Sequence, residues 1–203
     1  MNLKNKKIAV VGIGKSGFAA AKFLREQKAF VWATDSSQKQ EVLENASYLR
    51  SIGTAVETGG HTREFLAEAE MIVTSPGVSK ESLPLMFARE KKMPVISEIE
   101  LASRFFQGTI VGVTGSNGKT TTCNLIHRFL ADGGRHSILC GNVGYSFLDA
   151  VSRAGADSIA VLELSSFQLE DSPFFRPHIA VVLNVSPNHL DRHKTFENYI
   201  SAK

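Results

Sequence analysis

A glycine-rich stretch in the middle of the chain, "GVTGSNGKT" at residues 112–120, has the residue types that bind phosphate groups. It ends in the G-K-[ST] of the pattern G-x-x-x-x-G-K-[ST], although Gly112 lies one residue further back than that pattern asks. In such loops backbone N–H groups surround an anion, the lysine reaches the terminal phosphates and the hydroxyl binds Mg²⁺. We predict an ATP or GTP site that uses Gly115, Ser116, Asn117, Gly118, Lys119, Thr120 and Thr121.

Two further side chains are candidates for a metal site beside this loop. Glu163 follows four apolar residues in "IAVLELSS", and a carboxylate there is costly unless a counter-ion or a metal faces it. The carboxyl ends of parallel strands are where α/β proteins bind ligands, so we predict a metal role for Glu163. The alternative is a glutamate solvated just past the sheet edge. His189 follows the next strand, and a ligand role and an ordinary surface position stay equally open for it.

A second glycine loop lies near the start of the chain. "GIGKSG" carries Gly12, Gly14 and Gly17 between a short apolar strand and a helical pattern, and Asp35 ends the following strand. Glycines in this arrangement let the backbone approach a pyrophosphate, and the acidic residue can bind ribose hydroxyls. We predict a nucleotide or dinucleotide site here. The alternative is a glycine turn required only for close packing of helix on strand.

The elements that must position these loops alternate between strand and helix. Strand patterns at 7–12, 29–35, 69–77 and 93–97 are separated by helical patterns, and further strand patterns follow at 108–115, 136–142, 157–166 and 177–186. This alternation predicts parallel sheets covered by helices, an α/β fold. In the helix predicted at 119–132, Leu125, Ile126, Phe129 and Leu130 are expected on one face. We expect a Rossmann-like domain at 1–99 and a P-loop domain at 100–203.

Composition narrows the class of protein. Of the 203 residues 43% are hydrophobic and the net charge is +3, which fits a globular protein with anionic ligands and does not argue for nucleic acid. Two cysteines, Cys123 and Cys140, form no disulfide pattern, as expected in a reducing cytoplasm. The basic N-terminus leads straight into the first strand, so we expect neither a signal peptide nor membrane insertion.

Four motifs together resemble the Mur ligases of bacterial peptidoglycan synthesis. They are "GVTGSNGKTTT", "GNVG", "ELSSFQLE" and "LNVSPNHLDRH", and with "GIGKSG" and "TSPGV" they are most similar to the D-glutamate-adding branch of that family. The resemblance implies a cytoplasmic, monomeric ATP-dependent amide ligase. Such an enzyme phosphorylates UDP-N-acetylmuramoyl-L-alanine and lets D-glutamate attack the acyl phosphate. The resemblance also changes the interpretation of the first loop, from a redox-cofactor site to a site for the uridine nucleotide of the substrate.

The resemblance also assigns roles to individual residues. It implies that Lys119 contacts the ATP phosphates, that Thr120 and Glu163 hold one Mg²⁺, and that His189 and a carbamylated Lys203 support a second. Lys119, Glu163, His189 and Lys203 are then the expected catalytic residues. The substrate is expected to contact Gly14, Lys15, Ser16, Asp35, Ser36, Ser75, Pro76, Gly77, Asn142, Ser165, Gln168 and His189.

The end of the chain raises a separate expectation. "TFENYISAK" has helical spacing without a stop signal, and the family has a third domain and a chain about twice as long. We therefore expect an incomplete P-loop domain with little or no ligase activity by itself. Three alternatives stay open: another amide ligase similar to folylpolyglutamate synthase, a non-catalytic nucleotide-binding module, and a nicotinamide-dependent oxidoreductase that uses "GIGKSG" and Asp35.

Overall fold

The structure, a computed structural model, describes all 203 residues, and it divides into two compact units at Met1–Leu101 and Ala102–Lys203. Both units are parallel α/β sheets, which confirms the predicted fold class. The predicted boundary between a domain at 1–99 and a domain at 100–203 stays a prediction. Each unit is described below by itself.

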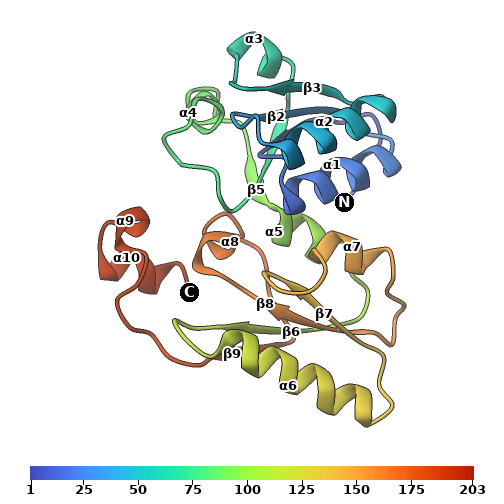
Figure 1. Cartoon of the computed structure of the whole chain (residues 1–203), viewed down its shortest axis with the longest axis vertical. Coiled ribbons are helices and arrows are strands. Elements are labelled where there is room, and N and C mark those ends of the chain that lie inside the picture. Colours follow the sequence, from blue (N-terminus) through green and yellow to red (C-terminus); the bar gives the residue numbers. More distant parts are fainter. The chain divides into compact units, whose positions relative to one another are not determined.

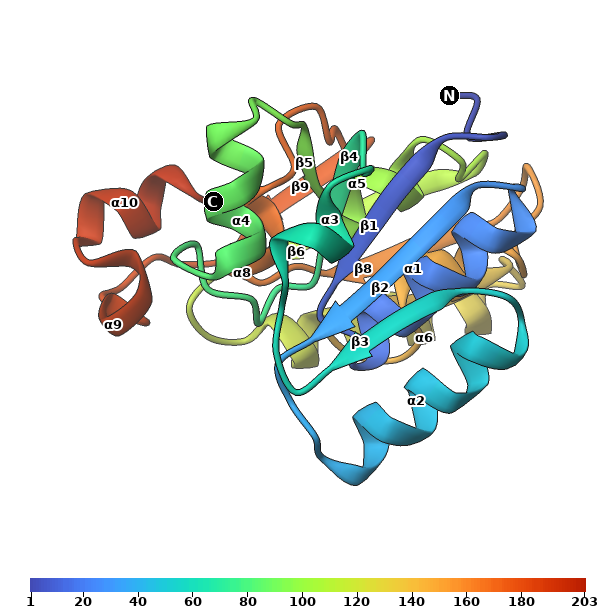
Figure 2. The same ribbon diagram turned by 90° about the horizontal axis from the view of Figure 1, so that it is seen from above.

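The first unit is a five-stranded parallel sheet with strand order β3-β2-β1-β4-β5. The strands are β1 (Lys7–Val11), β2 (Phe30–Asp35), β3 (Ala55–Thr58), β4 (Met71–Thr74) and β5 (Val95–Ser97). The helices are α1 (Lys15–Glu26), α2 (Gln40–Ser51), α3 (Arg63–Leu66) and α4 (Leu83–Glu90), and α5 (Glu98–Ser103) begins in this unit and ends two residues past its boundary. Figure 2 shows α1 and α2 on one face of this sheet and α3 and α4 on the other. The strand order reverses between β1 and β4, where sheets of this type bind ligands.

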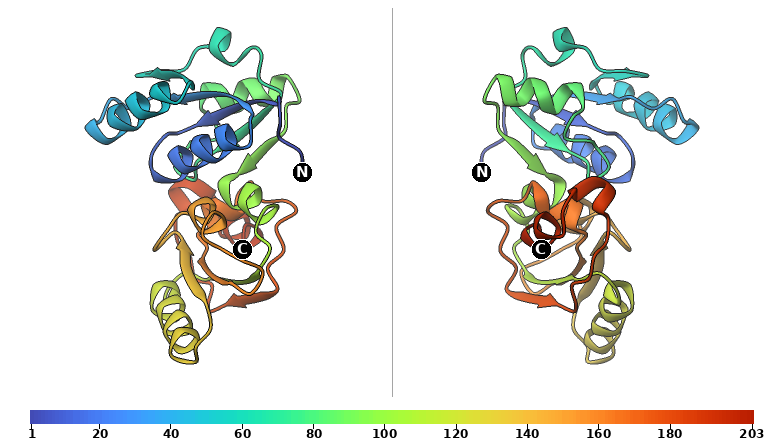
Figure 3. Two further views of the ribbon diagram at one scale, coloured as in Figure 1. Left: turned by 90° about the vertical axis from the view of Figure 1, so that its right-hand side faces the viewer. Right: turned by 90° about the vertical axis from the view of Figure 1, so that its left-hand side faces the viewer.

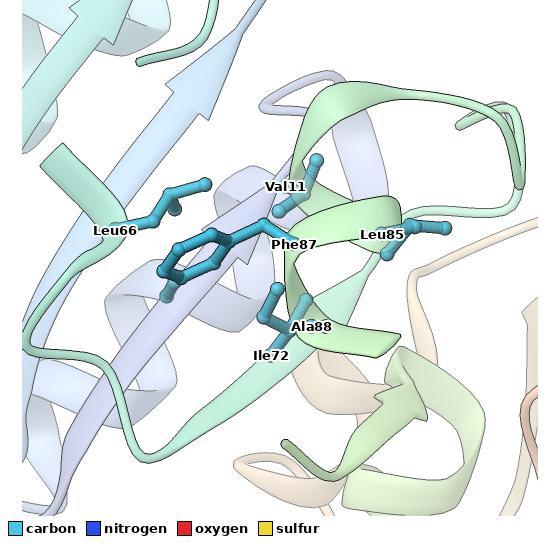
Figure 4. Close-up of a cluster of buried hydrophobic side chains, with 7 residues drawn as sticks. Val11, Leu66, Ile72, Leu85, Phe87 and Ala88 are labelled. Atoms are coloured by element: carbon cyan, nitrogen blue, oxygen red, sulfur yellow. The ribbon is translucent and has the colours of Figure 1, made fainter. Parts of the chain in front are cut away.

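Apolar side chains fill the layer between this sheet and the helices α3 and α4. Figure 4 shows Leu66 and the Phe87 ring next to one another, in one cluster with the strand residues Val11 and Ile72, and every buried member of the cluster is at most 7% exposed. The strands are apolar on both faces because helices cover both faces. This core fixes where β1 and β4 end, and with them the two loops that follow.

The second unit is a four-stranded parallel sheet with strand order β7-β8-β6-β9. The strands are β6 (Thr109–Thr114), β7 (Ser137–Gly141), β8 (Ile159–Glu163) and β9 (Ile179–Val182). The helices are α6 (Lys119–Asp132), α7 (Phe147–Val151), α8 (Ser166–Glu170), α9 (Leu190–His193) and α10 (Phe196–Ser201). Within this unit α6 lies on one face of the sheet and α7 and α8 on the other, as Figure 3 shows from two sides. Each face of the central strand β8 is therefore covered, and β8 is buried along its whole length.

Two sequence expectations differ from the fold. Strand β3 was not predicted, because this edge strand has no fully buried residue and so no apolar pattern. The four apolar residues of α6 do not share one face. Ile126 and Leu130 pack on the core of the second unit, whereas Leu125 and Phe129 are 50% and 70% exposed. Successive helix positions turn by about 100°, so neighbours such as Leu125 and Ile126 point in different directions.

Gly17 shows why the first loop needs a glycine for packing. A Cβ atom at Gly17 would lie 1.7 Å from the carbonyl oxygen of Gly12, because α1 crosses directly over the end of β1. Gly14 is different, since no atom lies within 4 Å of its hypothetical Cβ. Close packing of helix on strand therefore explains one glycine of the motif without excluding a ligand at the others.

We expect Gly17→Ala to destabilise the first unit by about 2 kcal/mol or more, as overpacking of a tight contact does. The gain in helix propensity from alanine, about 1 kcal/mol, only partly offsets this loss. Urea unfolding followed by circular dichroism measures the effect, with Gly14→Ala as the matched control. Equal stabilities for the two variants would show that α1 can move away from β1 without cost.

Candidate functional site

A cavity of about 390 Å³ opens at the switch point of the first sheet. It lies where the loops after β1, β2 and β4 meet. Its lining includes all eight residues of the first unit that were expected to contact the uridine nucleotide: Gly14, Lys15, Ser16, Asp35, Ser36, Ser75, Pro76 and Gly77. The structure therefore brings together residues that lie up to 63 positions apart in the sequence. Their role in binding stays a prediction.

Hydrogen bonds within the loops give this cavity its shape. The Asp35 carboxylate accepts from the backbone N–H of Ile13 at 2.7 Å and from that of Ser37 at 2.8 Å. On the other side, the Ser75 hydroxyl donates to the carbonyl oxygen of Gly12 at 2.8 Å. Asp35 thus already holds the first loop, and a sugar hydroxyl would have to use the lone pairs that remain on its two oxygens.

The phosphate loop of the second unit runs from β6 into α6. Gly112 lies inside β6, so the loop itself begins at Gly115 and the sequence pattern was placed too early in the chain. The Lys119 ammonium donates to the carbonyl oxygens of Gly115 and Ser116 at 2.9 and 3.0 Å. The lysine therefore lies over its own loop, close to where a phosphate bound by the loop would need a cation.

Glu163 lies beside this loop at the end of β8, where its side chain is 2% exposed. Its Oε2 accepts from the Thr120 hydroxyl at 2.7 Å and its Oε1 accepts from the Asn142 amide at 2.8 Å. A buried carboxylate needs such partners, since desolvation of an unpaired charge costs several kcal/mol. The three side chains come from α6, β8 and the loop after β7.

The pairing of Thr120 with Glu163 fits a magnesium ion. Adjacent oxygen ligands in an octahedron of 2.0–2.1 Å bonds lie about 2.9 Å apart. The hydroxyl and carboxylate oxygens of this pair are 2.7 Å apart and could both turn to one cation with little movement. Thr120 is on the surface while Glu163 is buried, so the pair is accessible from the phosphate loop.

Sequence reasoning missed the residues that hold the phosphate loop from the outside. Asn184, after β9, accepts from the backbone N–H of Asn117 at 2.9 Å and donates to its carbonyl at 3.1 Å. The Ser116 hydroxyl bonds the Ser186 carbonyl at 3.0 Å and the Tyr199 hydroxyl at 2.9 Å. The sequence does place polar residues directly after β9, next to the strand that leads into the loop. Their spacing alone, however, does not predict which of them reach the loop.

Several residues that were expected to contact the substrate form hydrogen bonds to other groups of the protein. Gln168 is 2% exposed. Its amide oxygen accepts from the backbone N–H of Ser165 and its own backbone N–H donates to the Ser165 hydroxyl, which together form a capping box on α8. Asn142 bonds Glu163 through both its side chain and its backbone N–H. These residues lie next to the metal candidate, but in this structure they hold the carboxylate and α8.

His189 is on the surface, in a left-handed backbone conformation at the start of α9, and its ring lies edge-on to Phe167 with centroids 4.8 Å apart. The structure gives it no hydrogen bond to Thr120 or Glu163, and no three His, Cys, Asp or Glu side chains gather as metal ligands. Its predicted part in a metal site therefore stays a prediction.

Comparison with known families agrees with this geometry. Residues 6–97 match the N-terminal domain of the MurD-like Mur ligases, and residues 113–203 match the Mur ligase middle domain. The chain belongs to the Mur ligase family. The predicted resemblance is thereby confirmed, and the phosphate loop, Glu163 and Lys203 all lie within the middle domain.

Individual relatives of this Mur ligase chain support the same assignment. It is 44% identical to the UDP-N-acetylmuramoylalanine–D-glutamate ligase of Koribacter versatilis and 45% identical to that of Acidobacterium capsulatum, in each case over its whole length. It spans 45% and 44% of those two proteins.

Among solved structures, a UDP-N-acetylmuramate:L-alanyl-gamma-D-glutamyl-meso-diaminopimelate ligase from Neisseria meningitides shares the fold. The TM-score is 0.62 at 19% identity, over 98% of this chain and 66% of that one. No helix of the Mur ligase chain has both the length and the apolar character to cross a membrane.

Lys203 lies against the start of the phosphate loop. Its ammonium donates to the Thr114 hydroxyl and to the Gly115 carbonyl, both at 3.0 Å. Burial, together with the nearby positive charge of Lys119, lowers the pKa of Lys203 from 10.5 to about 8. The two ammonium groups converge on the Gly115 carbonyl, so this loop is a strongly electropositive place.

This depressed pKa predicts a pH dependence of stability. Between pH 8 and 10.5 the unfolded Mur ligase chain binds more protons at Lys203 than the folded chain does, so the stability contributed here rises with pH. Lys203→Met removes the titration. In urea melts, we expect the free energy of unfolding of the unaltered chain to increase relative to that of Lys203→Met as the pH is raised from 8 to 10. A constant difference would contradict a buried ammonium.

Proposed function

We propose that this chain is the substrate- and phosphate-binding part of an ATP-dependent ligase that joins D-glutamate to UDP-N-acetylmuramoyl-L-alanine in peptidoglycan synthesis. The observation that carries the proposal is the group of Lys119, Thr120 and Glu163 at the carboxyl edge of one sheet. The names of relatives at 44% and 45% identity support the choice of substrates. We infer a cytoplasmic, monomeric enzyme on the same family grounds.

The first unit provides the place for the uridine nucleotide. Its cavity of about 390 Å³ is lined by backbone from two glycine-containing loops, by Lys15 and by the hydroxyls of Ser16 and Ser75. These groups suit a diphosphate, which accepts hydrogen bonds and attracts a cation. The nucleotide is then a handle on the substrate, which explains why a protein with a phosphate loop also has a dinucleotide-type fold.

The second unit provides the phosphoryl-transfer groups. Lys119 would turn from its loop carbonyls to the phosphates of ATP, and Thr120 and Glu163 would hold Mg²⁺. When bound, the ion neutralises charge on the phosphates during transfer to the substrate carboxylate. The acyl phosphate formed is open to attack by the amino group of D-glutamate, and phosphate leaves as the amide forms.

Lys203 also has a role in this proposal, as a candidate for carbamylation. An amine is nucleophilic only when deprotonated, and burial holds the pKa of Lys203 at about 8, so a useful fraction is neutral near pH 7. A neutral amine can attack CO₂ and release a proton to form a carbamate, so that a negative group stands where the ammonium was. Together with His189, such a group would support a second Mg²⁺, as the family resemblance implies.

The uridine part of the proposal predicts selective binding. By calorimetry, the chain should bind UDP-N-acetylmuramoyl-L-alanine and UDP but not NAD. Lys15→Ala should weaken binding about tenfold, the loss expected for one charge-assisted contact. Lys22→Ala is the matched control, because Lys22 lies on the same helix, stacks on Phe18 and Tyr48 and does not line the cavity. Binding of NAD in preference to UDP would overturn the proposal and favour an oxidoreductase.

A further inference from the structure

The segment after β9 carries two residues of the proposed site, yet it lies away from the layers of the sheet. It contains His189 at the start of α9 and Lys203 just after α10. Figure 1 shows α9 and α10 beyond the carboxyl ends of the strands in the second unit, and neither helix lies on a face of that sheet. Side-chain contacts must therefore hold the segment in place.

His193 makes the largest set of these contacts. The side chain is 4% exposed, its Nε2 lies 2.9 Å from the Ser166 hydroxyl and its Nδ1 lies 3.2 Å from a carboxylate oxygen of Glu170. Its ring stacks on Phe167 with centroids 5.4 Å apart. All three partners belong to α8, which begins three residues after Glu163. Both ring nitrogens are satisfied, as a buried histidine requires.

Arg192 strengthens the same attachment. Its guanidinium bonds the second carboxylate oxygen of Glu170 at 3.3 Å and lies over the Phe167 ring at 4.5 Å. Glu170 therefore receives both neighbouring side chains of α9, one on each oxygen. The contact joins two short helices that cannot be stable alone, since each has only four or five residues.

A second step leads from His193 to the phosphate loop. Tyr199 of α10 is 1% exposed, and its ring lies edge-on to His193 with centroids 5.3 Å apart. Its hydroxyl bonds the Ser116 hydroxyl of the phosphate loop at 2.9 Å. Lys203, four residues later, reaches Thr114 at the end of β6 and Gly115 at the start of the same loop. A continuous set of contacts thus runs from α8 through His193 and Tyr199 to the residues that surround the phosphates.

We propose that His193 is a positioning residue, which fastens α9 and α10 to α8 and so holds Tyr199 and Lys203 against the phosphate loop. Its side chain contacts α8 and Tyr199 and not the phosphate loop, Thr120 or Glu163. This deepens the proposed function, on which its effect on nucleotide binding rests, while its effect on the segment itself does not depend on that function. If His193 were only a core residue, any ring of similar size would replace it.

The test compares His193→Phe and Ser166→Ala with the matched control Ser158→Ala. Ser158 and Ser166 are both buried serines whose hydroxyl lies 2.9 Å from a histidine nitrogen, but Ser158 pairs with His136 at the opposite, amino edge of the sheet. Hydrogen–deuterium exchange is measured by mass spectrometry on the 203-residue chain. Local opening of the segment raises its exchange without unfolding the sheet.

We expect exchange in residues 194–203 to quicken about tenfold or more in His193→Phe and Ser166→Ala, with β6 and β8 changing less than about twofold. Ser158→Ala should leave residues 194–203 unchanged. His193→Gln, whose amide can still bond Ser166, should restore part of the protection. In the presence of Mg²⁺, the affinity for a non-hydrolysable ATP analogue should fall about fivefold in His193→Phe and recover in His193→Gln.

Two results would overturn the proposal. One is an unchanged rate of exchange in residues 194–203 in both His193→Phe and Ser166→Ala. The other is faster exchange spread equally over β6, β8 and residues 194–203. If the unaltered chain fails to bind the ATP analogue, the proposed function fails instead, and the exchange experiment still decides whether His193 positions the segment.

Discussion

The buried carboxylate of Glu163 is the constraint on which the second unit depends. A carboxylate that is 2% exposed needs close hydrogen-bond donors, and the Thr120 hydroxyl and the Asn142 amide supply them. These partners arrive from two directions, so β8 must lie between β6 and β7. Gly141 permits the approach of β7, since a Cβ there would lie 2.4 Å from the carbonyl oxygen of Glu163. The need of this carboxylate for partners thus accounts both for the strand order and for the candidate metal site.

The first unit solves a different physical problem, which is to present backbone and small side chains to a polyanionic ligand. Its loops lie at the place where the strand order reverses, and hydrogen bonds of Asp35 and Ser75 fix the shape of these loops. The second unit instead concentrates charge, with the Lys119 and Lys203 ammonium groups beside one carbonyl oxygen. One unit is therefore suited to recognise a nucleotide and the other to act on a phosphate.

Much of this could be predicted from the sequence, because the signals are local. Apolar runs give the buried strands, and glycines with a lysine and a hydroxyl give the phosphate loop. The proposal of a uridine site required the family resemblance, since the spacing in "GIGKSG" fits a redox cofactor equally well. Strand β3 and the tethers made by Asn184, His193 and Tyr199 were missed. They depend on side chains far apart in sequence that meet only after folding.

The central claim is that Glu163 and Thr120 form the magnesium site of the phosphate loop. The most direct measurement is the calorimetric affinity for a non-hydrolysable ATP analogue, with Mg²⁺ and with EDTA, in the unaltered chain and in Glu163→Gln. We predict that removing Mg²⁺ weakens binding at least about tenfold in the unaltered chain, because the metal joins the carboxylate to the phosphates, and much less in Glu163→Gln. An equal dependence on Mg²⁺ in both proteins would contradict the account.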